Sequence, residues 1–279
     1  MIIIFDPKTK KFPYPTDTAS HYITVKKDDK TVFNKDYPYI DKSKSMLFLQ
    51  WIVRVLLYII VFPVARVRLG LRIHGRENLK KHKEIIKNGV ISCSNHVHFW
   101  DYIAVMRTVL PKKTNILVWD KNIRGESGRL MRLVGGIPVP EGDVHASIAM
   151  MKSVGKQLDS GGWLHIYSEG SMWEYYRPIR PFKNGAAYLA CKFDKPVIPL
   201  AFSYREPGAI RKKIFHQIAL FDIHIGEPLF ADKTLPKDER VTDLLRRSHE
   251  AVCALAGFKE GENLYPPVYD NSKRIDYYN

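Results

Sequence analysis

The sequence predicts an α/β fold with a mixed, mostly parallel sheet flanked by helices and preceded by an apolar, membrane-associated helix. Two observations carry this prediction. From Gly75 onward, short segments typical of strands alternate with segments of helical periodicity, which favours helices packed in layers on a sheet. Before them lies an almost uninterrupted apolar stretch. We expect an N-terminal extension over residues 1–45, the apolar helix over residues 46–68 and one domain over residues 69–279.

The composition is that of a globular protein with a basic surface. Apolar residues make up 45% of the 279 residues, which is enough for a sizeable core. The formal net charge of +15 favours an anionic partner, which could be nucleic acid, an acidic lipid surface or a phosphorylated substrate. The three cysteines, Cys93, Cys191 and Cys253, form no CxxC pair and lack zinc-site spacing. We therefore expect a reducing compartment, without a disulfide framework or structural zinc.

Polar, aromatic and proline-rich pieces alternate in the N-terminal extension. Its first residues, MIIIFDPKTKKF, lack the basic region and the long apolar region of a signal peptide. Short strands are predicted at Tyr22–Lys26 and Thr31–Asn34, with the turn KDDK between them. The extension is either a small ordered appendage or a loosely ordered segment, and the sequence favours neither.

The apolar stretch from Met46 to Val64 is interrupted only by Gln50 and Arg54. A helix of about 18 residues, at about 1.5 Å per residue, nearly matches a bilayer core of roughly 30 Å. Pro63 is expected to end or kink this helix. Arg54 near the middle disfavours a full span and favours a helix that lies in the interface with its apolar side towards the lipid. The alternative is a buried core helix, which the flanking lysines and arginines disfavour.

The strands and helices of the domain follow from local patterns. NGVISCSN and TNILVWD are predicted strands, and YIAVMRTVLP between them is a predicted helix that stops at Pro111. RGESGRLMRLVGG predicts a short helix ending in glycines, and IPVP a short extended piece. Asp143 is a suitable N-cap for the helix that follows it, and Gly161 and Gly162 mark its end.

The remaining segments continue the alternation. WLHIYSEG predicts a strand and GAAYLACKF a helix, while KPVIPLAFSY and QIALFDIHIGEPL predict two further strands. The last segment, KDERVTDLLRRSHEAVCALAGF, has the spacing of an amphipathic helix. Its inward-facing residues are predicted to be Val241, Leu244, Leu245, Val252 and Leu255.

Two histidines and an aspartate follow the first predicted strand of the domain, in SNHVHFWD. A metal site would need three or four ligands with matched geometry, and no HExxH pattern supports one, so we expect no metal here. Either histidine could instead be a structural residue that caps the helix beginning near Phe99. For His98 we prefer this structural interpretation.

The spacing of His96 and Asp101 favours proton transfer. On one regular helix, five positions correspond to an offset of about 140°, so the two side chains would not share a face. If the strand ends near Ser94 and the helix begins near Phe99, the carboxylate can fold back to the imidazole. It would then orient the ring and stabilise the imidazolium, so that the histidine acts as a general base. No GxSxG nucleophile is present, so the base would activate a substrate hydroxyl for direct acyl transfer.

The stretch NHVHFWD resembles the Asn-His-x4-Asp signature of the glycerolipid acyltransferase family, which includes the 1-acylglycerol-3-phosphate acyltransferases. Three further blocks follow in the order of the family. ILVWDKNIRGESGRLMRLVGGIPVPEGD is similar to the second block and contributes Lys121. YSEGSMW and RPFKNG are similar to the third block and its continuation, and KPVIPLAFSY to the fourth. The resemblance covers about residues 70–255.

The resemblance implies roles for particular residues. His96 would be the catalytic base, and Asp101 would orient it. Substrate binding would involve Glu169, Gly170, Ser171, Lys183 and Lys121. Two phosphate-holding arginines of the family fall here on Pro140–Glu141 and on Met172. Arg177 and Arg180, together with Lys183, are candidates to replace them because they could form charge-assisted hydrogen bonds with a phosphate.

The function implied is that of an O-acyltransferase on the cytoplasmic face of a membrane. It would move a fatty acyl chain from acyl-CoA or acyl carrier protein to a hydroxyl of a lysolipid such as 1-acylglycerol-3-phosphate, without a cofactor. The basic surface would suit an anionic donor and an anionic membrane surface. Alternatives are an acceptor without phosphate, such as an amino-acid lipid, and a non-catalytic lipid-binding relative. Nucleic-acid binding is disfavoured because the basic residues are scattered and no known module occurs.

Overall fold

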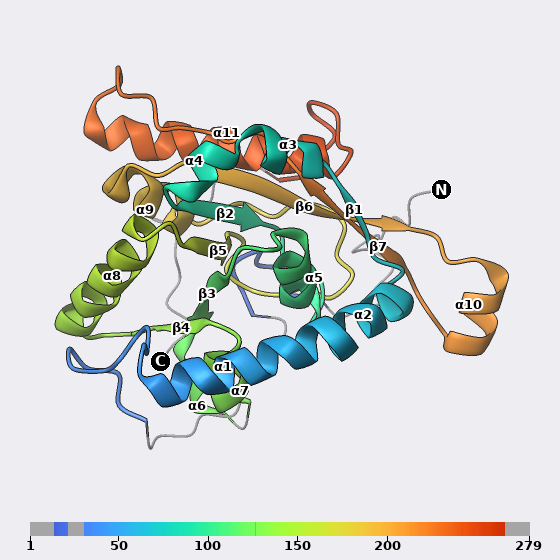
Figure 1. Ribbon diagram of the computed structural model, residues 1–279. Helices are drawn as coiled ribbons and strands as arrows, with labels where there is room; N and C mark the ends of the chain where they lie inside the picture. The colour runs from blue at the N-terminus through green and yellow to red at the C-terminus, as the bar shows by residue number, and fades with distance from the viewer. Residues whose placement is uncertain (1–13, 22–30, 126, 266–279) are drawn as a thin grey trace.

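The computed structural model describes residues 14–21, 31–125 and 127–265 (Figure 1). In this part of the chain the strands form a seven-stranded sheet in the order β1-β7-β6-β2-β5-β3-β4. The strands are β1 (Arg72–His74), β2 (Val90–Ser94), β3 (Thr114–Trp119), β4 (Gly136–Val139), β5 (Trp163–Tyr167), β6 (Val197–Arg205) and β7 (Leu220–Ile225). Neighbouring strands run parallel, except for the antiparallel pair β6 and β7. The predicted mixed, mostly parallel sheet is therefore confirmed.

Helices cover both faces of the sheet, as predicted (Figure 1). They are α1 (Lys44–Leu56), the π-helical turn η2 (Leu57–Val61), α2 (Phe62–Leu69), α3 (Arg76–Lys81), α4 (Lys83–Lys87), α5 (Asp101–Thr108), α6 (Asp120–Arg124), α7 (Gly128–Leu133), α8 (Val144–Asp159), α9 (Gly185–Phe193), α10 (Ala209–Phe215) and α11 (Lys237–Leu255). On one face, α8, α9 and α11 pack around one buried apolar cluster. On the other, α5 and the continuous helix α1–η2–α2 pack around a second cluster.

Strand pairing at the centre of the sheet brings two distant loops together. All five residues of β2 are buried, because helices cover both faces of the sheet at this strand. In the parallel pairing of β2 with β5, Ser94 lies opposite Tyr167. Both strands end at this point, so the residues that follow them emerge side by side at one edge of the sheet.

The strands and helices predicted for the domain are present, but several short elements were not predicted. α10 escaped prediction because its large apolar residues, Ile210, Ile214 and Phe215, are exposed and form no stripe towards the core. The elements β1, α3, α4 and α6 have three to six residues, which is too short to show a period.

The predicted strand at Thr31–Asn34 is wrong. These residues have no strand partner in the described chain. Phe33 is buried instead, and the Arg124 side chain holds the segment by donating to the carbonyl of Thr31 and lying over the Phe33 ring at 4.6 Å. The other predicted strand, Tyr22–Lys26, and the turn KDDK lie outside the described residues.

The apolar stretch forms one long helix from Lys44 to Leu69, which is long and apolar enough to cross a membrane. The helix continues through Pro63, so the proline does not end it. A proline lacks the N–H of a regular helix and crowds the preceding turn. The turn η2 directly before it accommodates this change, with the N–H of Phe62 donating to the carbonyl of Leu57 five residues earlier.

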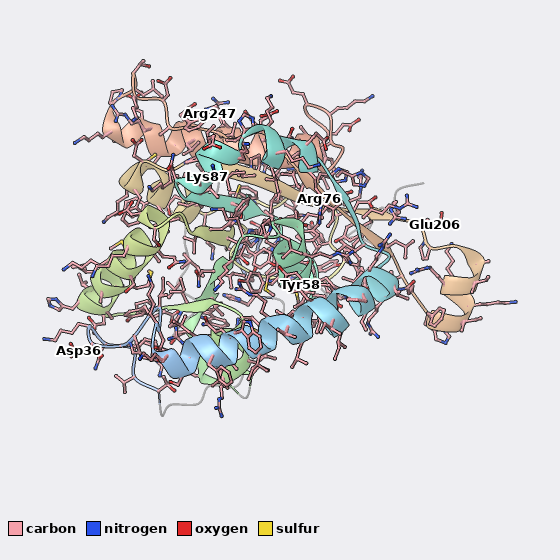
Figure 2. The ribbon with its side chains drawn as sticks, in the orientation of Figure 1. Asp36, Tyr58, Arg76, Lys87, Glu206 and Arg247 are labelled. Carbon is pink, nitrogen blue, oxygen red and sulfur yellow. The ribbon has the colours of Figure 1, made fainter. Side chains whose placement is uncertain are left out.

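The two sides of the long helix differ in burial. Leu57, Phe62, Ala65 and Leu69 are buried against the domain. The opposite side exposes the large apolar residues Phe48, Trp51, Leu56, Ile59, Ile60, Val64 and Val67. Figure 2 shows the side chains along this helix, among which Tyr58 is labelled. The same figure shows Glu206 next to α10. The helix lies across the surface of the domain (Figure 1). Its exposed residues form an apolar strip that faces outward.

Replacing Leu57 with alanine should destabilise the protein by about 2–5 kcal/mol, because the buried side chain would leave a cavity. Ile59→Ala, on the exposed side, should change the free energy of unfolding by less than about 0.5 kcal/mol. Urea unfolding in a mild detergent measures both values. Equal losses for the two variants would show that the helix does not pack on the domain by this side.

Candidate active site

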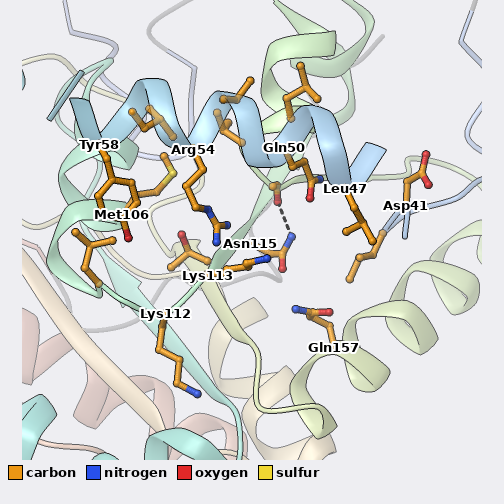
Figure 3. A pocket seen from close by; sticks show the side chains of 18 of the residues that line it. Asp41, Leu47, Gln50, Arg54, Tyr58, Met106, Lys112, Lys113, Asn115 and Gln157 are labelled. Carbon is orange, nitrogen blue, oxygen red and sulfur yellow. Dashed lines mark hydrogen bonds between the residues drawn. The ribbon is translucent and has the colours of Figure 1, made fainter. Parts of the chain in front are cut away.

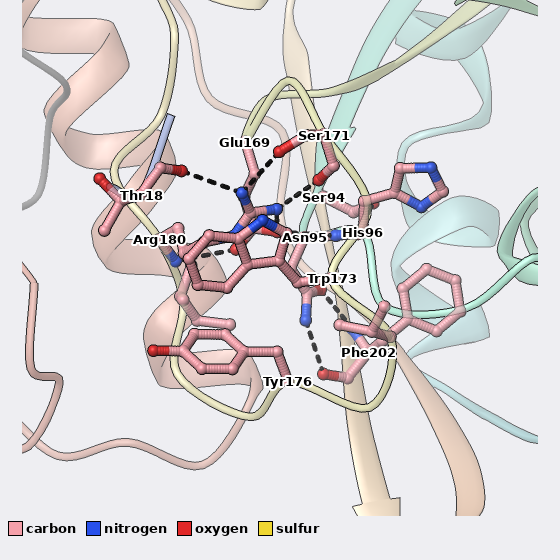
Figure 4. Close-up of polar contacts among 12 residues, drawn as sticks. Thr18, Ser94, Asn95, His96, Glu169, Ser171, Trp173, Tyr176, Arg180 and Phe202 are labelled. Atoms are coloured by element: carbon pink, nitrogen blue, oxygen red, sulfur yellow. Dashed lines mark hydrogen bonds and ion pairs between the residues drawn. The ribbon is translucent and has the colours of Figure 1, made fainter. Parts of the chain in front are cut away.

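The candidate site begins where β2 ends, at the edge that holds the carboxyl ends of β2 and β5. The side chain of Asn95 forms two hydrogen bonds with the backbone of β6 at this point (Figure 4). Its side-chain oxygen accepts from the N–H of Phe202 at 2.8 Å, and its amide nitrogen donates to the Phe202 carbonyl at 3.1 Å. The backbone is therefore fixed directly before the loop that carries His96.

His96 and Asp101 are in direct contact. Nδ1 of His96 lies 3.0 Å from Oδ2 of Asp101. The same oxygen accepts hydrogen bonds from the N–H groups of Val97 at 2.6 Å and His98 at 2.9 Å. Asp101 is buried at the first residue of α5, where the N-terminal end of a helix favours negative charge. The predicted turn is present, and the helix begins two residues after Phe99.

The contact with Asp101 determines which nitrogen of the His96 ring is available. A carboxylate accepts a hydrogen bond, so Nδ1 carries the proton in the neutral ring and Nε2 keeps its lone pair. His98 differs, because its Nδ1 accepts a hydrogen bond from the N–H of Trp100, the residue directly before α5, at 3.1 Å. Burial lowers the pKa of His98, which agrees with the structural interpretation.

Tyr167 supports the His96 ring and was not identified from the sequence. The two rings are stacked, with centroids 3.7 Å apart and planes 5° from parallel. Tyr167 is the last residue of β5, opposite Ser94 in the sheet. The aromatic residue at the end of the predicted strand WLHIYSEG was the available signal, but only strand pairing brings it to the imidazole.

A second histidine is buried next to this stack. The two ring nitrogens of His165 form hydrogen bonds with the hydroxyl groups of Ser92 at 2.9 Å and Ser94 at 3.3 Å. Burial is the main cause that lowers its pKa to about 3, and the nearby His96 adds to the effect. His165 is therefore neutral at ordinary pH and serves to hold β2 against β5.

Glu169 joins the His96 loop to the loop that follows β5 (Figure 4). Its Oε2 accepts from the N–H of His96 and from the guanidinium of Arg180, each at 3.0 Å. Its Oε1 accepts from the N–H of Arg180 at 2.8 Å. The Glu169 carboxylate thus sets the position of the His96 backbone.

Arg180 is fully buried, so the structure places it differently from the expected phosphate contact. Its guanidinium donates to Glu169, to the hydroxyl of Ser171 at 2.7 Å and to the carbonyl of Thr18 at 3.0 Å. It also lies 4.4 Å above the Trp173 ring. Burial lowers the pKa of Arg180, and Glu169 opposes that shift. These contacts favour a role in positioning the loop over a contact with the acceptor, and Ser171 shares this role.

Gly170 and Lys183 are packed against each other. Gly170 has a φ of +76°, and a Cβ at this position would lie 2.5 Å from Cε of Lys183. The N–H of Lys183 donates to the carbonyl of Ser168 at 2.7 Å. The left-handed backbone favours glycine at this position, whereas the flexible end of the lysine could move away from a Cβ.

Lys121 approaches the same region, whereas Arg177 does not. The Lys121 ammonium lies 4.3 Å from the Trp119 ring, on which His21 also stacks at 4.2 Å. Burial and, to a smaller extent, the charges of Lys183 and Lys121 lower the pKa of His21 to about 4, so both lysines lie near this imidazole. Arg177 lies 4.5 Å from the Phe258 ring and contributes to a different contact.

The described N-terminal residues 14–21 form part of the site, which the sequence did not indicate. The carbonyl of Ser20 accepts from the hydroxyl of Ser171 at 3.1 Å and from the indole N–H of Trp173 at 3.0 Å. The Tyr14 ring stacks on Trp173 with centroids 5.5 Å apart. Trp173 is therefore buried beneath this segment.

Among the described residues, one group of side chains could offer three ligand atoms to a metal, namely His74, Asp222 and His224. It lies on β1 and β7, away from His96. Arg205 donates to both oxygens of Asp222, at 2.8 and 2.7 Å, and so competes with a cation. The two imidazoles are stacked 13° from parallel, so their in-plane lone pairs do not converge on one point. This geometry does not favour a metal site.

Comparison with known proteins identifies one family. The model of the acyltransferase family matches residues 70–203, which include His96, Asp101, Glu169 and Lys183. Among solved structures, the chain is similar to the crystal structure of the 1-acyl-sn-glycerophosphate (LPA) acyltransferase PlsC from Thermotoga maritima. The sequence identity is 14%, the match covers 79% of this chain and 92% of that chain, and the TM-score is 0.48.

Replacing His165 with glutamine should weaken the dependence of stability on pH. The folded state holds the pKa of His165 at about 3, below the ordinary value of 6.5, so between these pH values the unfolded chain binds the extra proton. Stability therefore rises with pH in this window. Between about pH 7 and about pH 5 the residue should account for about 2 kcal/mol of lost stability.

Urea unfolding at the two pH values measures this difference, with the exposed His145→Gln as the matched control. The control should keep the slope of the unchanged protein, and His165→Gln should flatten it. Parallel slopes for all three proteins would contradict a buried, neutral His165.

Proposed function

We propose that the chain is a membrane-associated O-acyltransferase of the glycerolipid type, acting on a lysophospholipid such as 1-acylglycerol-3-phosphate, and the match of the acyltransferase family model to residues 70–203 supports this proposal. The donor is a thioester, either acyl-CoA or acyl carrier protein. The observation that carries this proposal is the contact of His96 with Asp101, which leaves Nε2 of the imidazole as a proton acceptor.

The reaction uses His96 twice. Nε2 accepts the proton of the acceptor hydroxyl while its oxygen attacks the thioester carbonyl, which forms a C–O bond and a tetrahedral oxyanion. When that oxyanion collapses, the C–S bond breaks and the imidazolium returns the proton to the leaving thiolate. Asp101 stabilises the imidazolium between the two steps, and Tyr167 and Glu169 keep the ring and its backbone in place.

Lys121 and Lys183 are the side chains that we propose for the phosphate of the acceptor or the donor. Both lie near His21, and Lys183 packs on Gly170 in the loop that also holds Glu169. Arg180 supports this loop from beneath through its buried contacts. The family arginines that this chain lacks are thus replaced by lysines, which recognise phosphate as point charges.

Association with the cytoplasmic face of a membrane is proposed on the basis of the long helix. Its exposed side is apolar, whereas its other side packs on the domain, an arrangement that favours a helix lying in the interface over one that crosses the bilayer. α10 extends the same surface, since Arg211 and Gln217 donate to the carbonyls of Val67 and Arg68. Its exposed apolar residues and its basic residues suit an anionic lipid surface.

His96→Ala should lower the rate of acyl transfer about 1,000-fold, because it removes the proton acceptor. Asp101→Asn should lower it about 100-fold, because the ring loses the carboxylate that orients it. The assay measures the transfer of labelled acyl chain from acyl-CoA to lysophosphatidic acid. The matched control is His145→Ala, at an exposed residue of α8.

Unchanged turnover in His96→Ala would reject the assignment of the base. The same assay with acceptors that lack a phosphate, such as amino-acid lipids, tests the alternative acceptor. Turnover with these lipids and none with lysophosphatidic acid would replace the proposed substrate. The absence of turnover with every acceptor and both donors would favour a lipid-binding relative.

The double substitution Ile59→Asp and Ile60→Asp should weaken binding to vesicles that contain phosphatidylglycerol by at least about tenfold, because two exposed apolar side chains no longer enter the lipid. Flotation of the protein with vesicles measures the bound fraction. Phe230→Asp, at an exposed apolar residue outside the helix, is the control and should bind like the unchanged protein. If the double variant binds vesicles as well as the unchanged protein does, the helix is not part of the surface that contacts the membrane.

A further inference from the structure

A cavity of about 230 Å³ lies beneath the long helix (Figure 3). The helix forms its roof, and the segment that leads into β3 forms the opposite wall. Figure 3 shows Gln50 and Arg54 pointing from the helix into the cavity, towards Lys113 and Asn115. One water molecule occupies about 30 Å³, so the cavity has room for a phosphate group together with part of its substituent.

This cavity is separate from the candidate active site. Thr114, in its lining, begins β3 and lies opposite Trp163, the first residue of β5. His96 instead follows the end of β2, where Ser94 lies opposite Tyr167, the last residue of β5. The two places are at opposite edges of the sheet, separated by the length of a five-residue strand, which is about 13 Å.

Arg54 is a half-buried cation without an acidic partner. In the part of the chain that the structure describes, its guanidinium has no hydrogen bond and no ion pair. Burial lowers its pKa, and no carboxylate is among the groups that oppose this shift. Removing a charged group from water without a partner is unfavourable, so an anion that enters the cavity would stabilise Arg54.

Other side chains around the cavity add to its positive charge. Lys42, Lys112 and Lys113 also line it, whereas Asp41 is the carboxylate of the lining. Lys112 donates to the carbonyl of Gly161 at 3.2 Å, and Lys113 is exposed and makes no hydrogen bond or ion pair with the described residues. Arg54 and Lys113 face each other across the cavity, and an anion between them would offset their repulsion.

Apolar side chains also line the cavity, and they are continuous with the outer side of the helix. Leu57 and Met106 are buried in the cavity wall. Leu47 and Tyr58 belong both to the lining and to the exposed apolar surface of the helix, with about 45% of each residue exposed. The mouth of the cavity therefore borders the surface proposed to contact lipid, which favours a ligand with a phosphate and an apolar part.

We propose that this cavity binds the phosphate group of an anionic membrane lipid at a site distinct from the one that holds His96. Arg54 and Lys113 contact the phosphate, Gln50 donates a further hydrogen bond, and Leu57 and Met106 contact the apolar part. The inference that the phosphate belongs to a membrane lipid rests on the proposed interfacial position of the helix. The site itself does not depend on acyl transfer.

The test measures binding of dihexanoyl phosphatidic acid, below its micelle concentration, to the full chain labelled with methyl-¹³C methionine. The NMR signal of the Met106 methyl group reports binding in the cavity. The loss of one signal in Met106→Leu assigns that signal to Met106. Arg54→Gln with Lys113→Gln should weaken binding at least about tenfold, because two charge-assisted contacts are lost. Lys113→Gln alone, at an exposed residue that does not affect folding, should weaken it measurably. Lys83→Gln on α4 is the matched control and should bind like the unchanged protein.

Three results would overturn the proposal. Equal affinity of the unchanged protein and both cavity variants would exclude Arg54 and Lys113 as the contacts. Equal loss of affinity in Lys183→Gln would place the probe in the site near His96. Binding of inorganic phosphate, or of dihexanoyl phosphatidylcholine, as tightly as dihexanoyl phosphatidic acid would exclude an anionic lipid as the preferred ligand. Since no arm measures turnover, failure here is distinguishable from failure of the proposed acyltransferase activity.

Discussion

The buried pair of Glu169 and Arg180 is the interaction on which the candidate site depends. One carboxylate accepts from the backbone of His96 and from both the backbone and the guanidinium of Arg180, and so joins two loops that are distant in the chain. Removing either partner would leave a buried charge unpaired, which is strongly unfavourable. The contacts that orient the His96 ring, from Asp101 and Tyr167, act on a backbone that this pair holds in place.

The N-terminal residues 14–21 complete that arrangement from outside the domain. Carbonyl groups of Thr18 and Ser20 accept hydrogen bonds from Arg180, Ser171 and Trp173, which would otherwise lack some of their partners. These contacts join residues more than 150 positions apart in the chain. The segment therefore contributes to the order of the loop after β5, and the family resemblance, which starts near residue 70, gave no indication of it.

The long helix separates two kinds of surface. Its buried residues contribute to the core on the α5 face of the sheet, and its exposed residues form the apolar strip that we propose to contact a membrane. Arg54, which disfavours a full span in the sequence, turns inward to the cavity and leaves the strip apolar. The helix continues through Pro63 because the wider turn η2 accommodates the missing hydrogen bond.

The sequence by itself determined the order of most strands and helices in the domain and the contact of His96 with Asp101. Both follow from local patterns, namely the periods of strands and helices and a short turn between them. The partners of Arg180, the stacking of Tyr167 on His96 and the inward direction of Arg54 were decided only by the tertiary structure. The predicted strand at Thr31–Asn34 failed for the same reason, since Arg124 and the core hold that segment. Which charges and rings become buried, and against which partners, depends on packing between segments far apart in the chain, and local patterns do not contain that information.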